Sequence, residues 1–304
     1  MPTYSLKADL LLLVTALIWG VAFVAQRAGM NYIGPFTFNT IRFAMGILVL
    51  LPFIFKGNVN NFAGQRTFHQ PTSRLVFWGQ ITLGIILFCA ASLQQVGLVY
   101  TTAGKAGFIT GLYVVIVPIL GMFLKQQTHL GTWLGAILAA AGLYLLSVTE
   151  NFTFVYGDFL ILIGALLWAV HVHLIGWLAL KTDSTVLAII QYLTCSILSF
   201  LMAFLFETIT FKGIWQAAVP ILYGGLLSVG VAYTLQVVAQ KEAHPAHAAI
   251  LLSLESVFAA IGGWLLLNEV LSFRGFIGCC LMLGGMLISQ LYRFIIQLVL
   301  SQRL

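Results

Sequence analysis

The stretches DLLLLVTALIWGV at residues 9–21 and DFLILIGALLWAV at residues 158–170 are two versions of one segment, with seven of thirteen positions identical. The aspartate, the alanine and the tryptophan match as well as the leucines. A second alignment places residues 92–147 on residues 234–289 without a gap, and twelve of its 56 positions are identical. The sequence therefore predicts an internal duplication.

Matched residues are 149 positions apart in the first alignment and 142 apart in the second. The difference corresponds to the long loop at 56–74, which has a shorter counterpart around Lys212. We therefore expect one repeat at 1–149, a second at 150–292, and a short C-terminal tail at 293–304.

The composition assigns these repeats to a membrane. Hydrophobic residues make up 61% of the 304 residues and charged residues only 7%, whereas about a quarter of the residues in a soluble protein are charged. Apolar runs of about 20 residues, long enough to cross about 30 Å of hydrocarbon, divide the chain into ten segments. An all-α integral membrane protein with ten transmembrane helices is predicted. The segments are 8–28, 35–55, 75–98, 103–124, 130–148, 156–178, 184–206, 215–239, 245–267 and 272–291.

Five spans in each repeat have a consequence for orientation. An odd number of crossings makes the second repeat enter the membrane from the opposite side, which gives two inverted-topology repeats. Secondary transporters use such repeats to expose a midplane site to either side of the membrane in turn. A duplicated bundle without transport activity and a channel remain the alternatives.

The distribution of positive charge favours cytoplasmic termini. The first apolar stretch lacks a small-residue cleavage site, so it is read as a span and not as a signal peptide. With the N-terminus inside, nine of the fourteen lysines and arginines are cytoplasmic, as the positive-inside rule expects. The sequence contains no basic cluster with interleaved aromatic residues, so no nucleic-acid partner is expected. The nine cations are Lys7, Lys56, Arg66, Arg74, Lys125, Lys181, Lys241, Arg293 and Arg303.

Several stretches resemble a known family. They are ALIWGVAFVAQ at 16–26, LVYTTAGKAGFITGLYVVIVPIL at 98–120 and AAILLSLESVFAAIGGWLLLNEVLS at 248–272. Together they resemble the drug/metabolite transporter superfamily, in particular its ten-helix EamA-type carriers. The resemblance implies a multi-pass carrier in the cytoplasmic (inner) membrane of a bacterium, often an exporter of amino acids, other metabolites or drugs. It also implies a central cavity between two five-helix halves. The family's usual Ser-Leu-Glu-Pro reads Ser-Leu-Glu-Ser at 253–256.

Glu255 is the first candidate functional residue. It lies ten residues into the span at 245–267, and a carboxylate near the centre of a helix costs about 2.5 to 3.5 kcal/mol on insertion scales. One interpretation is a group that binds substrate in the cavity and couples transport to protons. The other is a structural carboxyl that is neutral or bonded to backbone at a helix crossing.

Three further candidates occupy positions that match between the two repeats. Tyr113 is the counterpart of Glu255, and Gln94 is the counterpart of Gln236. The glutamines could hydrogen-bond a substrate, or they could bond neighbouring helices, which in membranes contributes about 0.6 kcal/mol on average.

Trp19 and Trp168 also match, and both lie deep in their spans instead of at the interfaces where tryptophan usually anchors a helix. They could line a cavity and stack on a ring or a cation, or they could simply fill volume.

The histidines give no metal site. His171 and His173 point about 200° apart on a regular helix, so they cannot bind one ion together. His171 could face the cavity as a polar or titrating group, although a histidine bonded inside the bundle is the alternative. His244 and His247 have no evident third ligand, and no metal or other cofactor is expected.

Two cations receive structural interpretations. We expect Arg42 to extend its guanidinium to the outer interface or to pair with a carboxylate of another helix. Lys105, at the start of the span at 103–124, is expected to act as an interfacial anchor, with attraction of anions at the outer mouth as the alternative.

The sequence as a whole predicts a secondary active transporter. We expect it to export a small metabolite, amino acid or drug-like compound by alternating access, linked to protons. A channel-like facilitator and a polytopic intramembrane enzyme are the alternatives. No HExxH, GxSxG or GxxxxGK[ST] motif occurs, so we expect neither an enzyme nor direct ATP hydrolysis. The partners expected are a small-molecule substrate, the lipid bilayer and protons, and the sequence assigns no oligomeric state.

Overall fold

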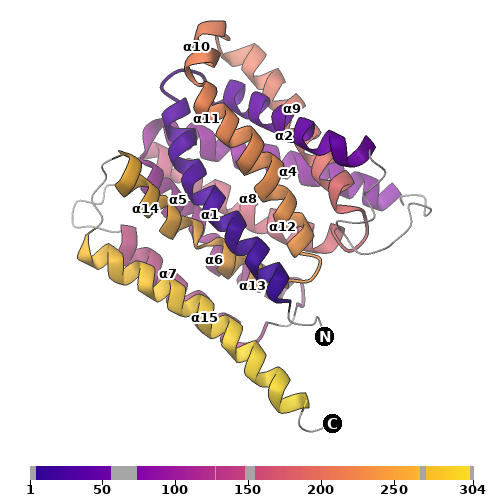
Figure 1. Cartoon of the computed structure of the whole chain (residues 1–304), viewed down its shortest axis with the longest axis vertical. Coiled ribbons are helices and arrows are strands. Elements are labelled where there is room, and N and C mark those ends of the chain that lie inside the picture. The colour runs from indigo at the N-terminus through magenta and orange to yellow at the C-terminus, as the bar shows by residue number, and fades with distance from the viewer. Residues whose placement is uncertain (1–4, 56–73, 127, 148–154, 268–271, 302–304) are drawn as a thin grey trace.

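The computed structural model describes residues 5–55, 74–126, 128–147, 155–267 and 272–301. Within these ranges the chain folds as a bundle of helices without strands (Figure 1). The predicted repeat boundary at 149 and 150 lies outside the described residues. So do three of the nine predicted cytoplasmic cations, Lys56, Arg66 and Arg303, and the side chain of Arg293.

In the described ranges, six helices belong to the first half of the chain and nine to the second. The first six are α1 (Leu6–Gly29), α2 (Pro35–Phe55), α4 (Arg74–Tyr100), α5 (Ala103–Gly111), α6 (Tyr113–Phe123) and α7 (Leu130–Ser147). The others are α8 (Tyr156–Leu178), α9 (Ser184–Phe206), α10 (Phe211–Gln216), α11 (Ala218–Leu222), the π-helix η1 (Tyr223–Tyr233), α12 (Thr234–Ala239), α13 (Pro245–Leu252), α14 (Glu255–Leu267) and α15 (Phe273–Ser301).

The chain is a multi-pass membrane protein. Among the described residues, eight helical stretches are long and apolar enough to cross a membrane. The predicted spans at 130–148 and 272–291 correspond to shorter apolar stretches, Leu130–Leu145 and Phe273–Ser289. Helix α15 continues to Ser301, so most of the segment predicted as a tail is helical.

Local sequence explains where the helices begin. The Ser5 side chain accepts a hydrogen bond from the Ala8 amide at the start of α1, and the Asp183 side chain caps α9 in the same way. Both side chains satisfy amide groups that have no partner inside the helix. Pro245 is the first residue of α13, where its missing N–H removes no helical bond.

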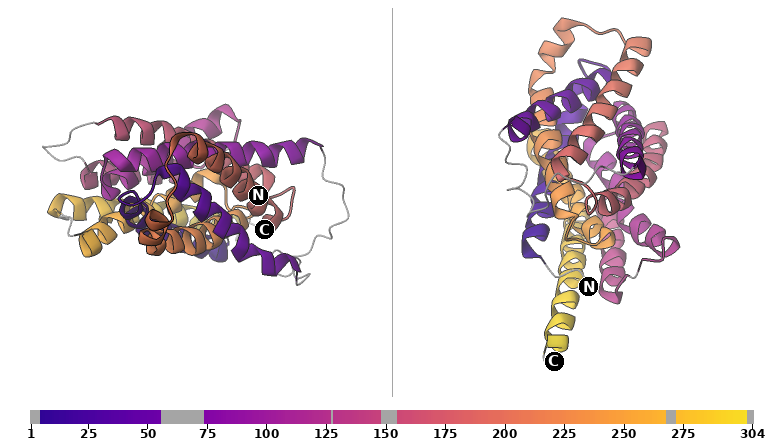
Figure 2. Two further views of the ribbon diagram at one scale, coloured as in Figure 1. Left: turned by 90° about the horizontal axis from the view of Figure 1, so that it is seen from above. Right: turned by 90° about the vertical axis from the view of Figure 1, so that its right-hand side faces the viewer.

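The first helix of each half packs on the later helices of the other half. Helix α1 contacts η1, α12, α13 and α14, while α8 contacts α4, α5 and α6. Helices α7 and α15 pack on one another at one side of the bundle, and α15 extends beyond the other helices (Figures 1 and 2). The core therefore lies between the two halves.

Two predicted spans are interrupted at matched positions. Leu112 separates α5 from α6, and Ser253 with Leu254 separates α13 from α14. At both breaks the amide bonds the carbonyl three residues earlier, from Leu112 to Ile109 at 3.3 Å and from Leu254 to Leu251 at 3.2 Å. This is the tighter 3₁₀ pattern. Leu112 and Leu254 are 142 positions apart, which is the spacing of the second sequence alignment.

The break before Glu255 forms without the proline that the resembled family carries there. Ser256 donates its hydroxyl hydrogen to the Gly107 carbonyl at 2.7 Å, which ties α14 to α5. A side chain at Gly111 would meet the Ser256 hydroxyl at 2.5 Å, so this close approach requires glycine. The π-helix η1 (Tyr223–Tyr233) is a second irregular segment of the bundle. π-Helical turns often occur at functional sites.

Candidate functional site

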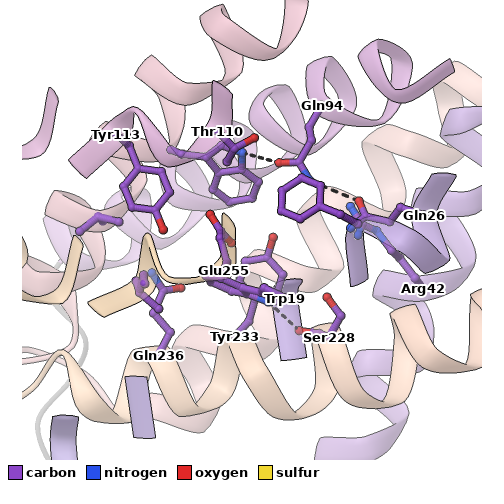
Figure 3. Close-up of a pocket in the computed structure, with 14 residues that line it drawn as sticks. Trp19, Gln26, Arg42, Gln94, Thr110, Tyr113, Ser228, Tyr233, Gln236 and Glu255 are labelled. Atoms are coloured by element: carbon purple, nitrogen blue, oxygen red, sulfur yellow. Dashed lines mark hydrogen bonds between the residues drawn. The ribbon is translucent and has the colours of Figure 1, made fainter. Parts of the chain in front are cut away.

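A cavity lies at the centre of the bundle, between the two halves. About 440 Å³ of empty space, part of it open to the surroundings, lies between its lining atoms (Figure 3). Seven lining residues come from the first half: Trp19, Phe23, Gln26, Arg42, Gln94, Thr110 and Tyr113. Seven come from the second half: Trp168, Val172, Ser228, Tyr233, Gln236, Leu252 and Glu255.

The cavity brings together six of the seven residues that the sequence singles out as substrate-binding candidates. They are Trp19, Gln94, Tyr113, Trp168, Gln236 and Glu255. The seventh, His171, does not line the cavity. It is fully buried, with its Nε2 atom 3.0 Å from the Gln191 side-chain oxygen and its ring edge-on to Trp168 at 5.4 Å. His171 therefore packs against Trp168, a residue of the cavity wall, without lining the cavity itself.

Most of the lining consists of residues matched between the predicted repeats. Two pairs are 149 positions apart and three pairs are 142 positions apart, the same spacings as in the sequence alignments. The pairs are Trp19 with Trp168, Phe23 with Val172, Gln94 with Gln236, Thr110 with Leu252, and Tyr113 with Glu255.

Glu255 stands directly after the break in its span, as the first residue of α14. A carboxylate is favoured at a helix N-terminus because unpaired amides and the helix dipole present positive charge there. Only 3% of Glu255 is exposed, and its Oε1 atom has no hydrogen-bond partner among the described residues. The Tyr113 hydroxyl points toward it in Figure 3 and bonds no other described side chain. These two side chains leave polar atoms available to a bound molecule.

The two glutamines differ in their bonding. Gln94 accepts a hydrogen bond from the Trp168 indole N–H at 2.9 Å and donates one to the Gln26 side chain at 3.3 Å (Figure 3). Gln94 thus makes the interhelical bonds that the structural interpretation expected. The Gln236 side-chain oxygen has no partner in the described part of the chain.

An aromatic cluster forms one wall of the cavity. Tyr233 stacks on Trp168 with ring centroids 6.0 Å apart and lies 4.6 Å from the Trp19 ring. The Trp19 indole donates to the Ser228 carbonyl at 3.2 Å, which fixes that ring. Both tryptophans therefore line the cavity as well as packing. Sequence reasoning missed Tyr233 because its counterpart in the first repeat is Ala91, so the alignment gave no signal.

The expectation for Arg42 is wrong. Its guanidinium does not extend to an interface, because the residue is 1% exposed and lines the cavity. Its Nε atom donates to the Asn39 side-chain oxygen at 2.9 Å, and its guanidinium lies over the Phe43 ring at 4.9 Å. Among the described carboxylates, none lies within ion-pair distance of Arg42. The Asn39 amide and the Phe43 ring, and not groups at the membrane surface, contact the Arg42 guanidinium.

Two polar pairs, each with a buried aspartate, lie outside the cavity. Lys105 forms an ion pair with Asp158 at 2.5 Å, and Asp158 also accepts from the Thr101 hydroxyl at 2.8 Å. Lys105 is therefore more than an interfacial anchor.

The second pair joins His247 to Asp9 at 2.8 Å, and the other ring nitrogen of His247 lies 3.3 Å from the Ser289 hydroxyl. No group of three histidine, cysteine, aspartate or glutamate residues suited to a metal occurs within the described ranges.

Comparisons with known proteins agree with this architecture. Residues 6–148 and 155–291 each match the EamA-like transporter family. An "Uncharacterized transporter" of Archaeoglobus fulgidus is 33% identical, over 94% of this chain and 86% of the relative. "Uncharacterized transporter YoaV" of Bacillus subtilis is 20% identical, over 93% and 96%. A solved crystal structure with 20% identity superposes with a TM-score of 0.76, covering 94% of this chain and 96% of that one, and so shares its fold.

Proposed function

Because the chain belongs to the EamA-like transporter family, we propose that it is a secondary active carrier that exports a small organic molecule by alternating access. The family and the names of the relatives indicate a membrane transporter and not an enzyme. One observation supports the proposed mechanism most directly. The central cavity receives seven residues from each half and lies where two helices are interrupted. Midplane sites flanked by broken helices are typical of transporters built from repeats.

We further propose that the two halves are inverted five-span repeats with both termini in the cytoplasm of the host cell. Support comes from the five matched residue pairs in the cavity wall and from the matched breaks at Leu112 and Leu254. Residues 1–149 and 150–292 are the two repeats in this proposal, and α15 carries the chain into the C-terminal segment.

Within the cavity, we assign proton coupling to Glu255. Its buried carboxylate has one oxygen without a partner and faces the Tyr113 hydroxyl. Gain or loss of a proton there changes the charge at the point where α14 begins, next to the break. The substrate lies against Trp19, Trp168 and Gln236, while Gln94 and His171 fix the Trp168 ring from two sides.

The test compares the extracellular metabolites of cells that overproduce the wild type with those of Glu255→Gln and empty-vector cells. Glu242→Gln is the matched control, because Glu242 is exposed and lies outside the cavity. We expect specific compounds to accumulate outside cells with the wild type and the control, but not with Glu255→Gln at equal expression.

A compound found in this way is then used in proteoliposomes. Saturable flux, counterflow and acceleration by a proton gradient are the expected results. Flux without saturation or counterflow would establish a channel instead. Equal flux and equal pH dependence in Glu255→Gln would remove Glu255 from the coupling mechanism.

A further inference from the structure

Arg42 is a permanently charged group in the wall of the cavity. Burial of an arginine inside a membrane protein is costly, so such residues are rare and usually paired or functional. Arg42 extends from α2 and is 1% exposed, and it contributes to the same cavity as Glu255. In the view of Figure 3, Arg42 and Gln26 lie at one end of the cavity, whereas Tyr113 and Gln236 lie at the other.

The surroundings of Arg42 compensate its charge only in part. One N–H bonds the Asn39 oxygen at 2.9 Å, and the faces of Phe43 and Phe38 lie 4.9 Å and 5.7 Å from the guanidinium carbon. The Nη2 atom of Arg42 and the side-chain nitrogen of Asn39 have no partner among the described residues. Buried donors are nearly always paired in folded proteins, so two adjacent unpaired donors require an explanation.

The chemistry of these donors selects the class of partner. A guanidinium has five N–H donors and no acceptor, and its planar fork fits the two oxygens of a carboxylate or phosphate group. The Asn39 bond holds the fork in one orientation, because it occupies the Nε atom on one edge. The Nη2 atom, which has no partner among the described residues, remains available to a ligand oxygen. No described carboxylate lies within ion-pair distance of Arg42, and the one carboxyl side chain among the lining residues, Glu255, does not pair with it.

We infer that Arg42 is an anion-binding group, and that the transported molecule carries a carboxylate or phosphate that pairs with its guanidinium. This inference rests on the proposed carrier function, and it deepens that function by naming the chemical class of the substrate. Asn39 is a positioning residue that orients the guanidinium.

Binding of simple anions to the purified full-length protein in detergent tests the inference without knowledge of the natural substrate. The probes are sodium acetate, sodium benzoate and inorganic phosphate at constant ionic strength, with sodium chloride as the baseline. Thermal unfolding is measured for the wild type, Arg42→Gln and Arg27→Gln. Arg27→Gln is the matched control, since it removes the same charge from the end of α1 without touching the cavity.

We expect at least one of the three oxyanions to stabilise the wild type and Arg27→Gln. The concentration that gives half of this stabilisation should be about tenfold higher or more in Arg42→Gln, as for loss of a charge-assisted hydrogen bond. A response to acetate or benzoate alone indicates a carboxylate substrate, and a response to phosphate alone indicates a phosphorylated one. Arg42→Lys, which keeps the charge but not the fork, should lie between the two.

Equal responses of the wild type and Arg42→Gln to all three probes would overturn the inference. If Arg42→Gln does not fold, the unfolding experiment is replaced by chemical modification of Arg42 with phenylglyoxal in the wild type. Protection of Arg42 by an oxyanion but not by chloride is the expected result, and equal labelling contradicts it. Transport of an uncharged or purely cationic compound at the wild-type rate by Arg42→Lys would refute the inference while leaving the carrier function intact. Arg42-dependent anion binding without any transport would support the anion-binding role and contradict the proposed carrier function.

Discussion

The two polar pairs are made by equivalent parts of the two halves, but with different chemistry. Asp9 and Asp158 lie in the first turns of the matched helices α1 and α8 and are 149 positions apart, while Lys105 and His247 are 142 positions apart. In each pair, an aspartate from the first helix of one half contacts a basic residue of the other half. We call Lys105–Asp158 the lysine pair and His247–Asp9 the histidine pair.

The pairs lie at different ends of the bundle. Asp9 is in the first turn of α1, whereas Gln26 near the other end of α1 bonds Gln94, close to the segment that leads to Lys105. At 1.5 Å per residue, the helix between Asp9 and Gln26 is about 25 Å long. The cavity thus has one polar pair towards each end, and each pair joins the two halves.

The pairs differ in how completely they are satisfied. Asp158 accepts bonds from the Thr101 hydroxyl and the Val155 amide in addition to its contact with Lys105. Asp9 has one oxygen without a partner in the described part of the chain. The lysine pair joins an ammonium to a carboxylate that accepts two further hydrogen bonds, whereas the histidine ring makes one contact with Asp9 and a longer one with Ser289. The comparison indicates that the histidine pair is the weaker and the more easily opened of the two.

The largest expected effect is a difference in stability. Asp158→Ala leaves the Lys105 ammonium without its carboxylate and should lower the free energy of unfolding by about 3 kcal/mol. Asp9→Ala should cost about 1 kcal/mol, because it removes one hydrogen bond to the His247 ring. Thermal unfolding in detergent measures both. Lys105→Met combined with Asp158→Leu is the control and should recover most of the loss. An equal cost for the two alanine variants would contradict the ranking of the pairs.

The next prediction concerns solvent access to the cavity. If the protein works by alternating access, each polar pair should keep one end of the cavity closed. The background is a variant without Cys89, Cys195, Cys279 and Cys280 that carries Ser228→Cys in the cavity wall. Asp158→Asn should increase labelling by an impermeant maleimide from outside whole cells by about tenfold, equivalent to about 1.4 kcal/mol. Asp9→Asn should do so in inside-out vesicles. If each variant increased labelling equally from both sides, the pairs would not hold opposite ends of the cavity closed.

The architecture was predictable because its signals are local in the sequence. The apolar segments at 156–178 and 184–206 have the bounds of helices α8 and α9, since span length follows from hydropathy. The breaks at Leu112 and Ser253 were not predicted. No proline marks them, and the one before Glu255 depends on the contact of Ser256 with Gly107, which exists only after the helices pack.

The cavity was predictable where the repeats kept matching polar or aromatic residues and where a carboxylate stood inside a span. Trp19 with Trp168 and Gln94 with Gln236 could be found from the repeats, and Glu255 from its position in the span. Arg42 could not, because whether a buried cation reaches an interface or a cavity depends on the tilt and neighbours of its helix. The polar pairs were missed for a similar reason. Lys105 and His247 are matched in position but differ in type, and their partners are distant in sequence.

An exchange of bases between the pairs gives a smaller effect with a defined sign. Lys105→His should leave stability nearly unchanged at pH 6, where the introduced imidazole is protonated, and lower it by about 1 kcal/mol at pH 8, where it is neutral. In the reciprocal exchange, His247→Lys, the introduced ammonium should contribute equally at both pH values, because lysine stays charged at pH 6 and at pH 8. Unfolding midpoints at the two pH values measure both variants. If Lys105→His were equally stable at pH 6 and pH 8, the charge of the lysine pair would not contribute to stability.

The hydroxyl groups at the two pairs give the smallest effect, and they test whether the lysine pair is stronger because of its additional bonds or only because of its charge. Thr101→Val removes a 2.8 Å bond to the Asp158 carboxylate and should cost about 1.5 kcal/mol, as for a hydrogen bond to a charged group. Ser289→Ala removes a 3.3 Å contact with the His247 ring and should cost about 0.5 kcal/mol. Combining Thr101→Val with Lys105→Met in a double-mutant cycle separates the two causes. Additive costs would mean that the hydroxyl and the ammonium act on Asp158 independently, so that the advantage of the lysine pair lies in the number of its bonds. A coupling larger than either single cost would mean instead that the ammonium holds the carboxylate in place for the hydroxyl, and the charge would then be the origin of the difference between the two ends.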